Sequence, residues 1–275
     1  MKKSQRQLSL IIPALLGAML CSAAARADIL GFGNFTNFTL PPNQTDGSSA
    51  PAVSPGMIHL TNNGGGEARS IFYDVPQSVS QFTASFTYQA VGGDGGSDAG
   101  ACFVLQNSAA GIHAIGGASR GMGYGFGTGG IGNPNGISPS IAIALGIGVD
   151  FDRLSTTGFF TNGNVGTGLI STDPVSLFSG HPINVTLSYD GAMLTETLLD
   201  TITSASFSTG YLQTIPSIVG GTTAYVGFTA STNSGGPDQA FSNFQFHSAP
   251  EPSSLVLAGI GIAGLLAYAR RRRRA

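Results

Sequence analysis

The sequence of 275 residues has no tryptophan and only two cysteines, Cys21 and Cys102. Cys21 lies in the apolar N-terminal segment, so the central part of the chain holds one thiol and cannot form an internal disulfide. Cys102 sits in the apolar run ACFVLQ, and no sequence neighbour supplies a base to activate it. We therefore expect a buried, unreactive thiol.

Positive charge is nearly missing between residues 28 and 248, the segment called the body below. The body has no lysine and three arginines (Arg69, Arg120 and Arg153) against 13 acids, which gives a net charge of −10. Nucleic acids and anionic lipids would repel such a surface. The charge therefore favours neutral sugars or cations as partners and excludes nucleic acid.

The basic residues gather at the two ends instead. Lys2, Lys3 and Arg6 precede a mostly apolar run from Leu8 to Leu20, and Ala25 and Ala27 supply small residues at alternate positions. This order is typical of a secretory signal peptide. We predict a signal helix in residues 1–27 with cleavage after Ala27, and passage through the export machinery.

The C-terminal end, residues 249–275, begins with a Pro-Glu-Pro triplet. A mostly apolar run of 15 residues, Leu255 to Ala269, follows, and then five arginines. With Ser253 and Ser254 the run just reaches the lower limit of a membrane-spanning helix, about 17 residues, and the arginines would stay on the cytoplasmic side. The triplet is Pro250, Glu251 and Pro252, and the arginines are Arg270, Arg271, Arg272, Arg273 and Arg274.

This order of triplet, apolar helix and arginine cluster resembles the PEP-CTERM sorting signal of Gram-negative bacteria. The resemblance implies recognition by an exosortase, a membrane-embedded cysteine transpeptidase or protease that would cut near the triplet. The protein would then pass from the inner membrane to the cell surface or the exopolysaccharide. In this interpretation the triplet and the arginines are recognition elements rather than parts of a fold.

The body shows the alternation of strands and almost no helical periodicity. Phe82 to Tyr88, Ile183 to Tyr189 and Ala224 to Ala230 each alternate apolar with small or polar residues. Asp190-Gly191 predicts a hairpin turn into Met193 to Leu199. Ile141 to Val149 is a longer apolar run that we expect to be buried on both faces. Together these segments predict an all-β, two-sheet antiparallel sandwich.

The order of these segments resembles the L-type (legume-type) lectin domain. Gly66 to Pro76 resembles its opening strand, Asp98 to Asn107 its "A-D-G-[IF]-A-F-V-L-Q" strand, and Gly116 to Gly125 its "G-G…G-L-G-Y" loop. Val149 to Asp152 resembles "V-E-F-D", and the two segments Val185 to Thr195 and Thr223 to Ala230 resemble later strands. The resemblance implies a concanavalin-like jelly roll with a shallow sugar site in the loops at one end.

In such lectins a carboxylate, a glycine N–H and an amide side chain bind sugar hydroxyls. The resemblance assigns the carboxylate to Asp98, one residue earlier than the family pattern because Ala99 precedes the glycine, and Asp94 is a rival. It assigns the N–H donors to Gly117 and Gly121, with Asn164 and Asn233 as amide candidates. Each of these residues also has an ordinary explanation as a solvated acid or a turn residue.

The resemblance further implies a calcium ion, whose ligands would include Asp150 and Asp152. Calcium prefers six to eight oxygens. Thr156 and Thr161 stand where the family has an Asn and an Asp, and Asn162 or Asn164 would have to replace them. The sequence therefore leaves calcium binding open.

Catalytic patterns are incomplete. The stretch Asp150-Phe151-Asp152 resembles the E-x-D-x-x-E of sandwich glycosidases, but Ser155 stands in place of the third acid. The four histidines, His59, His113, His181 and His247, accompany no serine nucleophile motif. We expect no enzyme but an exported, surface- or exopolysaccharide-associated carbohydrate-binding protein. The alternative is a structural matrix or adhesion protein whose sandwich no longer binds sugar.

Overall fold

The structure is a computed structural model of the whole chain. It describes residues 28–33, 35, 37–39, 52–93, 100–126, 136–149, 152–166, 168–233, 235–248, 261–262, 264 and 270–272. The predicted signal peptide, including Ala25 and Ala27, lies outside this part, as do Pro250, Glu251, Pro252, Arg273 and Arg274. Gly261, Ile262, Gly264 and Arg270 to Arg272 are helical. Among the described residues, no helix has the length and apolar character needed to cross a bilayer.

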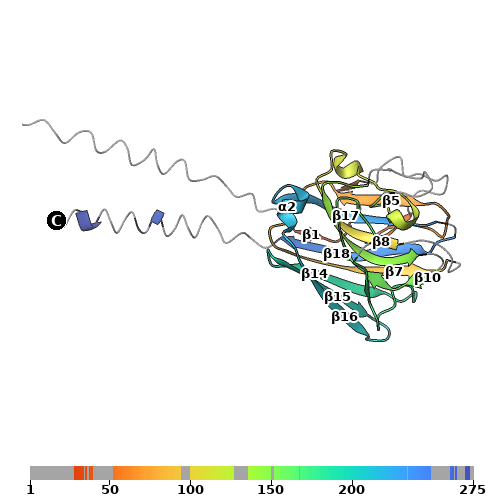
Figure 1. Ribbon diagram of the computed structural model, residues 1–275. Helices are drawn as coiled ribbons and strands as arrows, with labels where there is room; N and C mark the ends of the chain where they lie inside the picture. The colour runs from red at the N-terminus through yellow and green to blue at the C-terminus, as the bar shows by residue number, and fades with distance from the viewer. Residues whose placement is uncertain are drawn as a thin grey trace, which may run out of the picture.

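Two antiparallel sheets of eight strands each form the body (Figure 1). Sheet A has the order β16-β15-β14-β7-β18-β4-β3, with β1 also paired to β18. Its strands are β1 (Ile29–Leu30), β3 (Ala52–Ser54), β4 (Met57–His59), β7 (Phe82–Val91), β14 (Ile183–Tyr189), β15 (Met193–Asp200), β16 (Ser206–Leu212) and β18 (Asp238–Ser248).

Sheet B has the order β10-β9-β8-β17-β5-β2, with β12 paired to β9 and β6 paired to β17. Its strands are β2 (Phe38–Thr39), β5 (Ala68–Tyr73), β6 (Gln77–Ser78), β8 (Gly100–Gln106), β9 (Ser140–Val149), β10 (Asp152–Leu154), β12 (Phe159–Thr161) and β17 (Thr223–Ser231). Three short helices and a small separate sheet complete the fold: η1 (Gly111–His113), η2 (Ser119–Gly121), α2 (Ile215–Val219), and β11 (Thr156–Thr157) with β13 (Ile170–Ser171).

The alternating segments form the strands that their pattern predicts. In β14 every second residue from Ile183 is buried and the residues between are exposed, and β7 buries Phe82, Ala84, Phe86, Tyr88 and Ala90 on one face. The predicted hairpin is confirmed as well. Asp190 Oδ1 accepts hydrogen bonds from the N–H groups of Met193 (2.8 Å) and Ala192 (2.9 Å), which hold the pKa of its carboxyl below the ordinary value.

The core between the sheets is rich in aromatic rings. Phe228 on β17 lies at its centre, with ring centroids 4.4 Å from Phe241, 4.9 Å from Phe86 and 4.9 Å from Phe244. Phe32, from the segment after β1, packs 5.9 Å from the same ring. The N-terminal segment of the body therefore helps to fill the centre of the sandwich.

A second, smaller apolar core covers the outer face of sheet B. Met122, Tyr124 and Ile137 pack there against Cys102 and Val104 of β8, together with Phe72, Ala114, Ala142, Ala144 and Phe160. We call residues 107–126 and 136–139, which bring the covering side chains, the loop layer. Because of this cover, β9 is buried at every position from Ser140 to Gly146, as predicted. For the same reason β17 is buried without alternation from Val226 onward, where the sequence predicted a polar outer face.

The thiol of Cys102 is buried in this second core, 3.9 Å from Met122 Sδ, and burial raises its pKa. The expectation of a buried thiol is confirmed.

The sandwich has two ends that differ in their connections. At the loop end β5, β8 and β18 begin, and β7, β9 and β17 end. At the opposite, terminal end β1 begins and β18 ends, and α2 lies at this same end (Figure 1). The short helix α2 was not predicted, although Pro216 near its start and Gly220 after its end, at φ 77°, are typical helix boundaries.

Candidate functional site

The loop end is built on a buried ion pair. Arg69, near the start of β5, places an Nη atom 3.2 Å from Glu67 Oε1, and the two side chains are 3% and 0% exposed. Glu67 Oε2 accepts a hydrogen bond from Asn62 N–H at 3.0 Å. The attraction within a buried ion pair offsets the cost of desolvation only when the geometry is good and further hydrogen bonds satisfy the remaining polar atoms. This carboxylate therefore fixes the loop 62–67 to the sheet beneath it.

A hydroxyl network joins this loop to the chain that follows β17. Glu67 N–H donates to Thr232 Oγ1 at 3.1 Å, and this hydroxyl donates to Gly64 O at 2.8 Å. Gly66 N–H donates to Asn233 O, and Thr232 N–H donates to Glu67 O at 2.9 Å. The two loops thus form one hydrogen-bonded surface.

Sheet A contributes a third segment to the same end. Asn63 Oδ1 accepts from Asp238 N–H at 3.1 Å, and the Asp238 carboxylate lies 2.8 Å from His59 Nδ1. The side chains of Asn62 and Asn233 are exposed on this surface, beside the exposed Gly65. Amides offer donors and acceptors at once without charge, which suits sugar hydroxyls. The loop end therefore presents exposed amides over a rigid buried base, next to the partly exposed carboxylate of Asp238.

The glycines predicted as N–H donors lie in the loop layer and are already hydrogen-bonded. Gly117 N–H donates to Gly125 O at 2.8 Å, and Gly121 N–H donates to Ala118 O at 3.1 Å. Gly123, two residues after Gly121, has φ 68° and lies so close to the backbone of β5 and β17 that a Cβ would meet Arg69 O at 2.8 Å. These glycines explain the close packing of the loop layer, and their N–H groups are occupied in this conformation.

The strand register separates the two amide candidates. Asn233 follows Ser231, which is paired with Gly100, and Gly100 is paired with Ile147. Asn164 forms a bridge with Thr161, which is paired with Ile141. Six residues of β9 lie between these two levels, roughly 20 Å at the strand rise. Asn164 therefore does not join Asn233 in one sugar site.

The acidic candidates fall largely outside the described residues. Asp94, Asp98 and Asp150 are not described, and of Asp152 only the backbone is, at the first position of β10 opposite Val149. This position belongs to the loop end. Asn164 lies eight residues of β9 away from it, so the two residues cannot share one ion.

The described residues do not fit a calcium ion. They contain no group of three His, Cys, Asp or Glu side chains that could hold a metal. Asn162 Oδ1, the other amide candidate for calcium, accepts from Ser140 N–H at 3.1 Å. A threonine replaces a carboxylate or amide of the family pattern at position 156 and again at 161. Two positions of the family's ligand set therefore hold threonines, and the amide oxygen of Asn162 is engaged in the fold.

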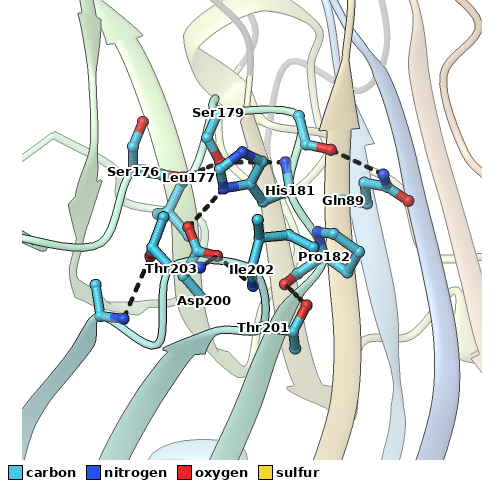
Figure 2. A network of polar contacts seen from close by, with 12 residues as sticks. Gln89, Ser176, Leu177, Ser179, His181, Pro182, Asp200, Thr201, Ile202 and Thr203 are labelled. Atoms are coloured by element: carbon cyan, nitrogen blue, oxygen red, sulfur yellow. Dashed lines mark hydrogen bonds and ion pairs between the residues drawn. The ribbon is translucent and has the colours of Figure 1, made fainter.

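Three of the four histidines pair with aspartates, which the sequence did not indicate. Besides His59 with Asp238, His247 Nδ1 lies 3.0 Å from Asp28 Oδ2, and His181 Nδ1 lies 2.8 Å from Asp200 Oδ2. Figure 2 shows the last pair. Burial alone would raise the pKa of Asp200, but hydrogen bonds from Thr203 N–H, His181 and Ile202 N–H hold it well below the ordinary value.

The surroundings of His181 are structural. Ser179 Oγ accepts from the backbone N–H of His181 at 3.2 Å and donates to Ser176 O at 2.9 Å (Figure 2). Among the described residues no serine hydroxyl is hydrogen-bonded to the imidazole of His181, so the network has no nucleophile and base in contact. It ties the beginning of β14 to the end of β15.

One buried acid was missed entirely. Glu196 on β15 points into the sandwich, and its Oε2 accepts from Thr157 Oγ1 at 2.7 Å and from Tyr211 OH at 3.1 Å. Burial raises its pKa to about 7, although the hydrogen bonds from Thr157 and Tyr211 act in the opposite direction. The signal was present in the sequence, because Glu196 shares the inward parity of Leu194 and Leu198.

Comparison with known proteins places both parts of the chain. Residues 248–274 match the family model of the PEP-CTERM protein-sorting motif. No curated protein matches the sequence. The body has the fold of solved legume lectins. Arcelin-5, a lectin-like defence protein from Phaseolus vulgaris, superposes with a TM-score of 0.62 at 17% identity, covering 82% of this chain and 99% of its own.

Two further lectin structures agree. The metal-free form of lectin I-B4 from Griffonia simplicifolia has a TM-score of 0.62 at 17% identity over 82% of this chain and 100% of its own. The lectin from Bauhinia forficata in complex with GalNAc has a TM-score of 0.61 at 15% identity over 80% and 96%. The chain thus carries a PEP-CTERM protein-sorting motif behind a body with the legume-lectin β-sandwich fold.

Proposed function

We propose that the protein is an exported lectin-like protein that binds carbohydrate at the loop end of its sandwich. The observation that carries this proposal is the juxtaposition of exposed, uncharged amides on a lectin fold that precedes a sorting motif. The exported body would hold extracellular polysaccharide, and the C-terminal segment would determine where the body is retained.

The negative charge of the body favours neutral over anionic polysaccharides as partners. With 13 acids against three arginines, the body would repel uronate-rich or sulfated chains over the distance of a Debye length. Asn62 and Asn233 add hydrogen-bonding capacity without charge. A neutral polysaccharide is therefore the partner that this surface fits best.

The sorting step is assigned to the C-terminal motif. An exosortase would cut near Pro250 to Pro252 while the apolar run and the arginines hold the chain at the inner membrane. The product would reach the cell surface or the extracellular matrix of a Gram-negative bacterium.

A second candidate function has support from specific contacts. The N–H groups of Gly117 and Gly121 are bonded within the loop layer, and threonines stand at positions 156 and 161 where the family pattern has an Asn and an Asp. Both observations favour a structural matrix or adhesion protein whose sandwich has kept the fold and lost the sugar site. The sugar-binding experiment below separates the two candidates.

For sugar binding, we expect the body to bind neutral polysaccharides on a glycan array, and Asn62→Ala and Asn233→Ala to weaken binding about tenfold each. The reason is that a sugar hydroxyl left without its partner costs about 1–3 kcal/mol. Asn164→Ala is the matched control, because the register places Asn164 about 20 Å from Asn233.

The same array tests the acids. Asp98→Ala and Asp152→Ala should also lower affinity if the resemblance assigns the carboxylates correctly, and a parallel array with a calcium chelator shows whether an ion contributes. If the wild-type body binds neither neutral nor acidic glycans on the array, sugar binding is rejected and the matrix candidate is supported.

For sorting, we expect Glu251→Ala, or deletion of Arg270 to Arg274, to leave an unprocessed precursor in the membrane fraction. The reason is that the first change alters the recognition triplet and the second removes the cationic stop. The measurement is the mass and the cellular fraction of the mature protein. Asn233→Ala, whose change lies at the loop end, should be processed normally, and mature protein of unchanged mass and location in the tail variants would contradict the assignment.

A further inference from the structure

The first and last strands of the body lie side by side in sheet A (Figure 1). Ile29 of β1 is paired with Phe246 of β18, and Leu30 with Gln245. The side chains of Asp28 and His247 extend this contact by an ion pair of 3.0 Å. The body therefore begins and ends at one place, the terminal end of the sandwich.

These strands are directly continuous with the two segments that export removes or recognises. Asp28 follows the predicted cleavage site after Ala27, and the sorting motif begins at residue 248, next to His247. Neighbouring strands are about 4.8 Å apart. The two processing segments therefore leave the body about one strand spacing from each other.

The chain length between the body and each apolar run is short. Six residues, 249–254, separate Ser248 from Leu255, and seven, 21–27, separate Leu20 from Asp28. Fully extended, they span at most about 22 Å and 25 Å. Either apolar run, once inserted in a bilayer, would hold the terminal end within that distance of the membrane surface.

We propose that the terminal end, where β1 pairs with β18, faces the inner membrane throughout export, and that the loop end points away from it. The signal run and the sorting run impose the same orientation, because both leave from this end. Removal of the signal peptide therefore changes neither the orientation nor the distance at which the sorting segment meets the exosortase. The proposal rests on the sorting half of the proposed function and is independent of sugar binding.

The orientation has a consequence for access. β18 has 11 residues, which span about 37 Å at the strand rise. The loop end, with Asn62 and Asn233, thus lies far from the lipid surface while the body is still anchored. A polysaccharide could be bound before the sorting segment is cut.

The test uses the full chain in vesicles of phosphatidylethanolamine and phosphatidylglycerol that carry a nitroxide on the lipid headgroup. A thiol-reactive fluorophore is placed at Leu30→Cys, at the terminal end, or at Asn233→Cys, at the loop end, in a Cys21→Ser background. Cys102 is fully buried and stays unlabelled. We expect severalfold stronger quenching at position 30 than at 233.

A second pair on other strands guards against a local disturbance of β1. Leu212 and Ile202 are 74% and 66% exposed, at the terminal and loop ends of sheet A respectively. Leu212→Cys should be quenched severalfold more than Ile202→Cys. Equal quenching within both pairs, or stronger quenching at the loop end, would overturn the proposal. The glycan array on unlabelled Leu212→Cys and Ile202→Cys, which keep Asn62 and Asn233, reports sugar binding separately.

Discussion

Phe228→Ala is expected to lower the free energy of unfolding by about 4 kcal/mol. The ring is fully buried and touches Phe86, Phe241 and Phe244 from sheet A as well as Phe103 from its own sheet. Deleting it removes the apolar contacts that join the two sheets and leaves a cavity that rigid strands cannot close. Urea unfolding followed by far-ultraviolet circular dichroism gives the value.

The loss is a large fraction of the stability of an ordinary domain, about 5–15 kcal/mol. Phe126→Ala is the matched control, because the same atoms are removed from a side chain that is 46% exposed. We expect a change below about 1 kcal/mol for the control. If Phe228→Ala also lowered the free energy of unfolding by less than about 1 kcal/mol, the inter-sheet core would not be built around this ring.

Glu196→Gln is expected to stabilise the protein in alkaline solution. The pKa of Glu196 rises from 4.5 to about 7 on folding because the carboxyl is buried between the sheets. Between these two values the unfolded chain loses the proton and the folded chain keeps it, so wild-type stability falls as pH rises. The loss is complete above about pH 7 and amounts to about 3 kcal/mol. Glutamine does not titrate, so the variant does not lose this stability as the pH rises.

The measurement is urea unfolding of both proteins at pH 5 and pH 8. The advantage of Glu196→Gln should grow between the two. Tyr211→Phe is informative as a companion, because removing a hydrogen-bond donor from the carboxylate raises the pKa of Glu196 further and extends the loss of stability to higher pH. Parallel pH profiles for wild type and Glu196→Gln would show that this carboxyl does not titrate differently in the two states.

The strands were predictable where one face meets the core and the other meets water. β7 and β14 satisfy this condition. The alternation gave both limits of β14 and the start of β7, which continues three residues beyond the predicted Tyr88 to Val91. β17 does not, because the loop layer covers its outer face, and this cover comes from a segment about a hundred residues away in sequence. A periodicity within one strand carries no information on such a distant partner.

The site was less predictable than the fold for a related reason. The resemblance to lectins supplied Gly117, Gly121 and Asn164, but hydrogen bonds within the loop layer and the register of β12 on β9 decide what these residues do. Asn62 and the buried pair of Glu67 with Arg69 carry no motif of their own. Their importance arises from Thr232, which the chain brings back more than 160 residues later.

The separate apolar core under the loop layer has a consequence for how such a protein can diversify. Four buried side chains of the layer pack against six on the outer face of sheet B, while the aromatic core between the sheets is built from other residues. Insertions and substitutions in the layer would disturb the packing of the smaller core alone. The contacts between the two sheets would be unchanged. Sequence change in the loop layer is therefore expected to leave the packing between the two sheets intact.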